Sequence, residues 1–76
     1  MNIKGLNIVM TRHFFERVEE RDIDVKRIKM LLEKNTLKDG ENLLVEENYK
    51  NPLTVVVAKD GEKVALITAY FRGVTM

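Results

Sequence analysis

The dipeptide Asp60-Gly61 joins two long extended runs, and this feature restricts the fold more than any other in the chain. The run before it, "LTVVVA" (53–58), is apolar and β-branched on both faces, which is typical of a central strand. "KVALITAYF" (63–71) follows as its partner, because Asp-Gly between two such runs favours a tight hairpin. An earlier stretch, "LLVEENY" (43–49), ends close to the turn signal Asn51-Pro52 and predicts an outer strand. The second half of the chain therefore predicts an antiparallel sheet.

The first half of the chain has a helical period instead. Thr11 is a good N-cap for a helix that continues to about residue 21, with Phe14 and Val18 on its apolar stripe. Asp24 is a good N-cap for a second helix, which ends near Asn35. "NIVM" (7–10) is either a further strand or the lead-in to the first helix. We therefore predict a single α+β domain over residues 1–76, with two N-terminal helices packed on one face of a small three- to four-stranded antiparallel sheet.

Composition excludes several kinds of site. The 76 residues include one histidine and no cysteine, so we expect no zinc site, and the four glycines are too scattered for a phosphate-binding loop. There is no serine for a Ser-His-Asp hydrolase. The acidic pair Glu46–Glu47 is interpreted as solvated surface, and Arg27 is placed on the outer side of the second helix. We expect no cofactor and no metal.

Charge and hydropathy restrict the partners. The formal net charge of +1 is low for a protein that binds nucleic acid over its whole surface, so RNA binding requires a local patch. No apolar run approaches the ~20 residues that span a bilayer, and the N-terminus lacks the apolar core of a secretory signal. We therefore expect a cytoplasmic protein with no membrane association.

The last predicted strand carries polar residues at one end. Alternation places two sets of side chains on opposite faces: Val64, Leu66, Thr68, Tyr70 and Arg72 on one, and Ala65, Ile67, Ala69 and Phe71 on the other. The alanine-containing face would let a helix approach closely, so it is assigned to the helices. The opposite face then begins apolar and ends polar, which predicts a candidate site at the end of the strand.

His13, Arg17 and Arg21 fall four residues apart and form one strip on the first predicted helix. His13 suits a general base or a hydrogen-bonding group, or it simply pads the junction between helix and sheet. Two arginines at this spacing repel each other slightly, which an anion bound between them would offset. Pairing with Glu20 or Asp24 would offset the repulsion equally well, so both interpretations remain open.

These residues also carry a resemblance. "TRHFFERVEERDIDVKRIKMLLEKN", with its H-x-x-x-R-x-x-x-R helix, followed by "LTVVVAKDGEKVALITAYF", resembles the RelE/barnase/EndoU/colicin-like ribonuclease-fold superfamily over about residues 11–72. The resemblance implies a toxin-like, metal-independent endoribonuclease in which the ribose 2′-OH attacks the adjacent phosphate. It implies that His13, Arg17 and Tyr70 are catalytic and that Arg21 and Thr68 bind substrate. We add Arg72 to the substrate-binding residues as a phosphate clamp.

The partners expected from this resemblance are RNA molecules: tRNA, mRNA or ribosome-bound RNA. The alternative is a phage- or plasmid-type interaction protein of the same fold, without enzymatic activity, that modulates a host protein. Such a partner, or an antitoxin, would add a strand to the outer strand 43–50 through Leu44 and Tyr49. A third interpretation is an inactive relative that binds RNA, in which the arginines are essential and His13 is dispensable.

Overall fold

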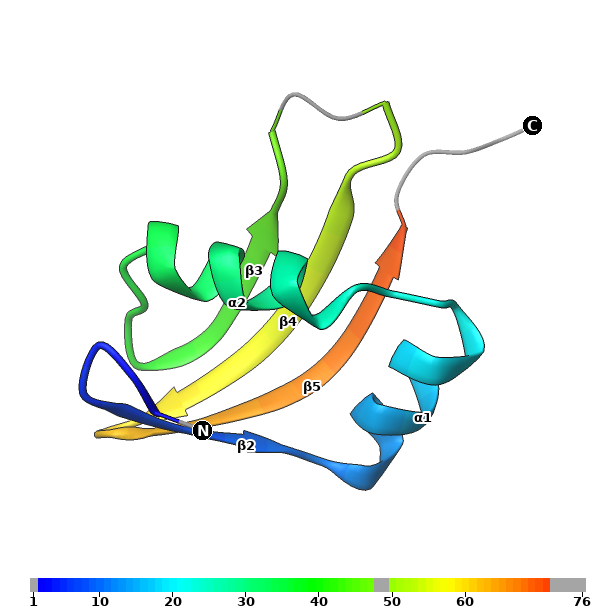
Figure 1. The fold of residues 1–76 in the computed structure, drawn as a ribbon. Helices are drawn as coiled ribbons and strands as arrows, with labels where there is room; N and C mark the ends of the chain where they lie inside the picture. Colours follow the sequence, from blue (N-terminus) through cyan, green and yellow to red (C-terminus); the bar gives the residue numbers. More distant parts are fainter. Residues whose placement is uncertain (1, 48–49, 72–76) are drawn as a thin grey trace.

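The computed structural model describes residues 2–47 and 50–71, which form two helices and a five-stranded sheet (Figure 1). In chain order the elements are β1 (Asn2–Ile3), β2 (Leu6–Met10), α1 (Arg12–Glu20), α2 (Val25–Lys34), β3 (Gly40–Val45), β4 (Leu53–Asp60) and β5 (Lys63–Phe71). The strand order across the sheet is β1-β2-β5-β4-β3. The predicted hairpin of β4 and β5 is confirmed, with Asp60 opposite Lys63.

The predicted antiparallel sheet of three or four strands is wrong, because the sheet is mixed and has five strands. β2 pairs in parallel with β5, with Ile8 opposite Val64, while the other neighbouring strands are antiparallel. Strand β4 occupies only one edge of β5, and the apolar run at residues 7–10 covers part of the other edge. Ile8 is 4% exposed as a result. This pairing joins segments more than fifty residues apart, so no pattern within a short stretch of the sequence predicts it.

Strand β1 was also not predicted. It forms a hairpin with β2 through the two-residue turn Lys4-Gly5, in which both residues have positive φ (56° and 80°). Positive φ at both central positions is the requirement of a type I′ turn, which matches the right-handed twist of paired strands. Lysine is not among the residues that usually mark such a turn, so the hairpin gave no clear signal in the sequence.

Both predicted helices are confirmed, together with their caps. The Thr11 hydroxyl accepts a hydrogen bond from the backbone N–H of Phe14 at 3.1 Å, and the Asp24 carboxylate accepts one from Lys26 at 2.9 Å. Each bond satisfies one of the N–H groups that the first turn of a helix leaves without an intrahelical partner. Asn35 follows the last helical residue of α2, as predicted.

The short joint between the helices is a Schellman motif. Asp22 adopts a left-handed φ of 51°, its N–H donates to the carbonyl of Glu19 at 3.3 Å, and the N–H of Ile23 donates to the carbonyl of Val18 at 3.0 Å. These bonds satisfy carbonyls at the end of α1 and turn the chain sharply. Ile23 and Val18 are both buried, which is the hydrophobic contact that commonly accompanies this motif.

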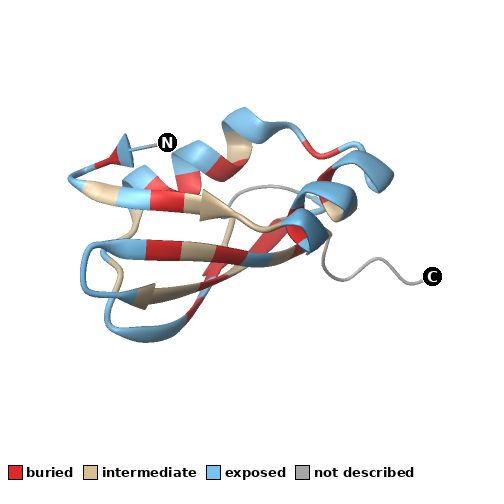
Figure 2. Ribbon diagram, turned by 90° about the horizontal axis from the view of Figure 1, so that it is seen from below, coloured by how far each residue is buried: buried red, intermediate tan, exposed pale blue. Residues whose placement is uncertain are grey.

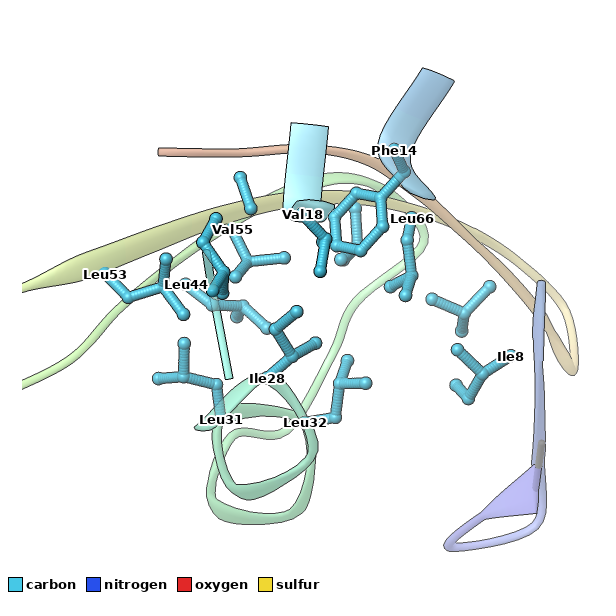
Figure 3. Packing of buried hydrophobic residues seen from close by; sticks show 14 of the residues in the cluster. Ile8, Phe14, Val18, Ile28, Leu31, Leu32, Leu44, Leu53, Val55 and Leu66 are labelled. Carbon is cyan, nitrogen blue, oxygen red and sulfur yellow. The ribbon is translucent and has the colours of Figure 1, made fainter. Parts of the chain in front are cut away.

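Side chains from both helices and from all five strands meet in one core (Figure 3). Ile28, Leu31 and Leu32 point from α2 toward the sheet, while the ring of Phe14 on α1 lies beside Leu66 of β5. In Figure 2 the buried positions alternate with more exposed ones along β3 and most of β5, as expected for a sheet with its core on one face. The opposite face of the sheet is not covered by either helix.

Strand β3 lies at the edge of the sheet, as predicted, but at different residues. It covers Gly40–Val45 rather than 43–49, and Tyr49 lies outside the described residues. Leu44, predicted to contact a partner, is instead buried at 4% exposure in the core, while Leu43 is 59% exposed. Alternation along the strand explains the difference, because adjacent side chains point to opposite faces.

One buried hydroxyl in the sheet lacks a partner. Thr54 lies between Val45 and Tyr70 in register, is 1% exposed, and its Oγ1 makes no hydrogen bond with any described residue. Replacing Thr54 with valine keeps the shape and removes the unpaired polar group, so we expect a stability gain of about 1 kcal/mol. Urea unfolding followed by circular dichroism measures this change.

Thr11 supplies the matched control for that substitution. Its hydroxyl accepts from Phe14 and donates to the carbonyl of Leu66, so Thr11→Val should instead cost about 1–2 kcal/mol. A loss of stability in Thr54→Val similar to that in Thr11→Val would show that the Thr54 hydroxyl has a partner in solution.

Candidate functional site

The sides predicted for the last strand are wrong for its first half, because β5 contains a bulge. Thr68 and Leu66 lie opposite consecutive residues of β4, so Ile67 between them has no opposite residue. The extra residue reverses the alternation along the strand. Val64 and Leu66, predicted on the open face, are therefore fully buried in the core, and Ile67, predicted to face the helices, is 37% exposed.

Beyond the bulge, the predicted sides are correct. Ala69 is fully buried and Phe71 packs against the core, so both turn toward the helices. Alternation then directs Thr68 and Tyr70 to the uncovered face of the sheet, where Tyr70 is 37% exposed. Arg72, the third polar residue predicted here, lies outside the described residues.

Helix α1 runs along the edge of this part of β5. The parallel pairing of β2 with β5 ends at Met10 opposite Leu66, where the chain turns into α1. The Thr11 hydroxyl donates to the carbonyl of Leu66 at 3.1 Å, and Nη1 of Arg21 donates to the carbonyl of Ala69 at 2.6 Å. Side chains at both ends of the helix thus donate hydrogen bonds to backbone carbonyls of β5.

The strip of His13, Arg17 and Arg21 winds from solvent toward the strand. Each step of four residues rotates a position by about 40° around the helix, so the three side chains do not share one direction. His13 is exposed, Arg17 is partly buried, and Arg21 reaches the β5 backbone. The structure thus brings Arg21 next to the segment that carries Thr68 and Tyr70. His13 lies about 12 Å from Arg21 along the helix axis.

The three residues of the strip differ in their partners. Arg17 donates to Glu20 at 2.9 Å, which confirms the predicted surface pair. Arg21 uses one of its five N–H groups on the Ala69 carbonyl, and Asp24, its other predicted partner, instead accepts from Lys26. The imidazole of His13 makes no hydrogen bond with any residue in the described ranges. Its exposure leaves it accessible to a ligand.

An ion pair that the sequence did not predict ties α2 to the sheet. Arg27 binds Glu46 through both carboxylate oxygens, with Nε donating at 2.8 Å and Nη2 donating to the other oxygen. The same carboxylate accepts from the backbone N–H of Leu53 at 2.8 Å, and the Arg27 guanidinium lies 5.3 Å from the ring centre of Phe71. The interpretation of Glu46 as solvated surface is wrong, since its side chain is 6% exposed. The prediction that Arg27 lies on the outer side of α2 is also wrong, because its guanidinium binds Glu46.

This pairing changes the acidity of Glu46. The hydrogen bond from Arg27 is the main cause that lowers the pKa of the Glu46 carboxyl, helped by the N–H of Leu53 and opposed by burial. Nineteen residues separate Arg27 and Glu46, so helical or strand spacing gives no signal of the contact. The pair acts as a structural clasp between α2 and the sheet.

A cavity of about 270 Å³ lies between α2 and the end of β3. It is lined by Arg27, Met30, Leu31, Lys34, Asn35, Val45, Glu46 and Glu47. None of the predicted site residues contributes to it. The cavity and the strip on α1 are therefore two separate features of the molecule.

The described part of the chain contains neither a metal-binding cluster nor a membrane-spanning helix. It contains no group of three or more His, Cys, Asp or Glu residues placed to hold a metal ion. No helix in residues 2–47 and 50–71 is long and apolar enough to cross a membrane.

The comparisons with known proteins give one match. No curated protein and no solved structure matches the chain. A family model, described as a domain of unknown function (DUF4258), matches residues 10–71, which include both helices, strands β3 to β5 and the whole of the strip on α1. The chain therefore belongs to the DUF4258 family.

Proposed function

We propose that the protein is a metal-independent endoribonuclease whose site lies between the strip on α1 and the polar end of β5. The observation that carries the proposal is the hydrogen bond from Arg21 to the Ala69 carbonyl. It anchors the end of α1 that carries Arg17 and Arg21 beside the strand segment that holds Thr68 and Tyr70. Arginines next to exposed hydroxyl groups suit the binding of a phosphodiester, because guanidinium binds phosphate oxygens in a planar, bidentate geometry.

The proposed reaction follows from the chemistry of RNA. The ribose 2′-oxygen forms a bond to the adjacent phosphorus, and the bond from phosphorus to the 5′-oxygen breaks, which leaves a 2′,3′-cyclic phosphate. A base must take the proton of the 2′-OH, and an acid must supply one to the departing 5′-oxygen. The resemblance assigns His13 to one of these roles and Tyr70 to the other. Arg17 and Arg21 stabilise the charge that develops on the phosphorane.

The resemblance to the RelE/barnase/EndoU/colicin-like superfamily supports this proposal, as does the exposed imidazole of His13. The low net charge of +1 restricts binding to this strip, so a structured substrate such as tRNA or ribosome-bound mRNA fits better than RNA of any sequence.

Cleavage of RNA in EDTA tests the proposal directly. We expect the purified protein to cleave tRNA or ribosome-bound mRNA without a metal ion. His13→Ala should reduce the rate by about 100-fold or more, since a positioned acid or base contributes about 10²–10⁴-fold. The side chain of Arg12 is 94% exposed and pairs with Glu16, and the residue lies about 100° around the helix from His13, so Arg12→Ala is the matched control and should cleave within about threefold of the wild type.

Circular dichroism must show that both variants remain folded. No cleavage by the wild-type protein on either substrate would contradict the proposal. Cleavage by folded His13→Ala at the wild-type rate would remove His13 from the site. RNA binding without cleavage, lost in Arg17→Ala but kept in His13→Ala, would instead identify an inactive RNA-binding protein.

A further inference from the structure

The edge of β3 offers backbone hydrogen bonds that no described strand uses. β3 is the last strand in the order, whereas β1 at the other edge is only two residues long. The N–H of Glu46 donates to the carbonyl of Leu53, and donors and acceptors alternate in direction along an antiparallel strand. The N–H and C=O groups of Glu41, Leu43 and Val45 therefore point outward from the sheet.

A cavity lies beside this edge, so an added strand would find a pocket for a side chain as well as backbone hydrogen bonds. The last turns of α2 extend past β3, the outer strand of the sheet (Figure 1). The cavity of about 270 Å³ lies between these two elements. Met30, which is 53% exposed, and the buried Leu31 give it an apolar wall. A strand added to β3 would place alternate side chains on the α2 side of the sheet, next to this cavity.

Charge indicates the chemistry of the occupant. Helix α2 carries four cations, Lys26, Arg27, Lys29 and Lys34, but only one carboxylate, Glu33. Arg27 is already paired with Glu46, and the other two charged residues that line the cavity, Lys34 and Glu47, are both exposed, so the excess positive charge belongs to α2 and not to the β3 end of the cavity. An added strand with carboxylates would therefore be attracted to the helix, and a basic one would be repelled.

A second copy of the chain does not fit this site. If two β3 strands paired with each other, their side chains facing the cavity would be those of Asn42 and Leu44. Both are buried in the core of their own molecule, at 8% and 4% exposure, so neither can fill the cavity of another copy. The occupant must be a segment whose side chains are free on both faces.

We propose that the β3 edge and the adjacent cavity bind an extended segment of a partner protein, in which apolar residues alternate with carboxylates. Its backbone pairs with Glu41, Leu43 and Val45, an apolar side chain enters the cavity against Met30, and a carboxylate meets Lys34. Strand β4 separates β3 from β5, so this surface is distinct from the strip on α1. A segment bound here leaves the proposed RNA site open.

Selection from a random library of short displayed peptides, followed by amide hydrogen exchange, tests this inference. We expect the enriched peptides to alternate apolar and acidic residues. A synthetic copy should slow exchange of the outward amides of Glu41, Leu43 and Val45 by about tenfold or more, and proline at its central position should abolish binding. RNA cleavage, if present, should continue with the peptide bound.

Two charge reversals on α2 distinguish binding at the cavity from a general electrostatic attraction to the helix. Lys34→Glu should weaken binding of the synthetic peptide by about tenfold, and Lys26→Glu, which does not line the cavity, by less than about threefold. The inference is overturned if no peptide binds more tightly than about 1 mM, or if bound peptide leaves the three amides unprotected. Equal weakening by the two variants would also overturn it.

Discussion

Replacing Phe14 with alanine should destabilise the domain by about 3–5 kcal/mol, while the same replacement at Phe15 should cost less than about 1 kcal/mol. The two residues are adjacent on α1, but Phe14 is fully buried and Phe15 is 50% exposed. Phe14 fills the space between α1 and β5, and its loss would leave a cavity that the surrounding side chains cannot close.

The expected loss is large for a chain of this size. At about 0.05–0.15 kcal/mol per residue, 76 residues give a total stability of roughly 4–11 kcal/mol. Phe14→Ala should therefore unfold partly or wholly at physiological temperature. Urea unfolding of both variants at 10–25 °C, with the wild type as reference, measures the difference. Equal losses at the two positions would contradict the placement of α1 against the sheet.

Local signals explain why much of the fold could be predicted. The N-caps Thr11 and Asp24 act within three residues of their partners, and the Asp60-Gly61 turn joins strands that are consecutive in the chain. Each of these depends on side chains that are close in sequence, so a short window contains the whole cause. The helices and the central hairpin follow from such windows alone.

The errors arose where pairing is distant or where one extra residue changes the pattern. The parallel pairing of β2 with β5 made the sheet mixed, yet it joins the two ends of the described chain. The unpaired Ile67 reversed the faces of β5, because strand periodicity has a period of two and a single insertion shifts it. Neither feature has a local signature.

The candidate site, like the fold, could be predicted from the sequence only in part. The strip on α1 could be found from spacing, since helical residues four apart are neighbours. Its contact with β5 through Arg21 and Ala69 depends on how the helix packs, which spacing does not reveal. The clasp of Arg27 and Glu46 was missed for this reason too, because a charged residue looks solvated until its distant partner is placed.

Glu46→Gln should cost about 1–3 kcal/mol at neutral pH, and the cost should shrink in acid. Glutamine keeps the size of the side chain but removes the charge that Arg27 and the N–H of Leu53 bind. Because the pKa of Glu46 is lowered in the folded protein, its carboxylate stabilises the fold above the ordinary pKa of 4.5. That contribution is lost as the pH falls below 4.5 and through the lowered value, where the wild-type carboxyl becomes protonated as well.

The neighbouring Glu47 provides the matched control, since it is exposed and makes no ion pair with a described residue. Urea unfolding of the wild type, Glu46→Gln and Glu47→Gln should be measured at neutral pH and at several values down to about pH 3. The gap between the wild type and Glu46→Gln should narrow in acid, while Glu47→Gln should follow the wild type throughout. Asp39, whose pKa is lowered mainly by its hydrogen bond with Lys59, keeps some acid sensitivity in all three proteins. A gap that stays constant with pH would mean that Glu46 contributes its shape rather than its charge, and the clasp would then not be ionic in solution.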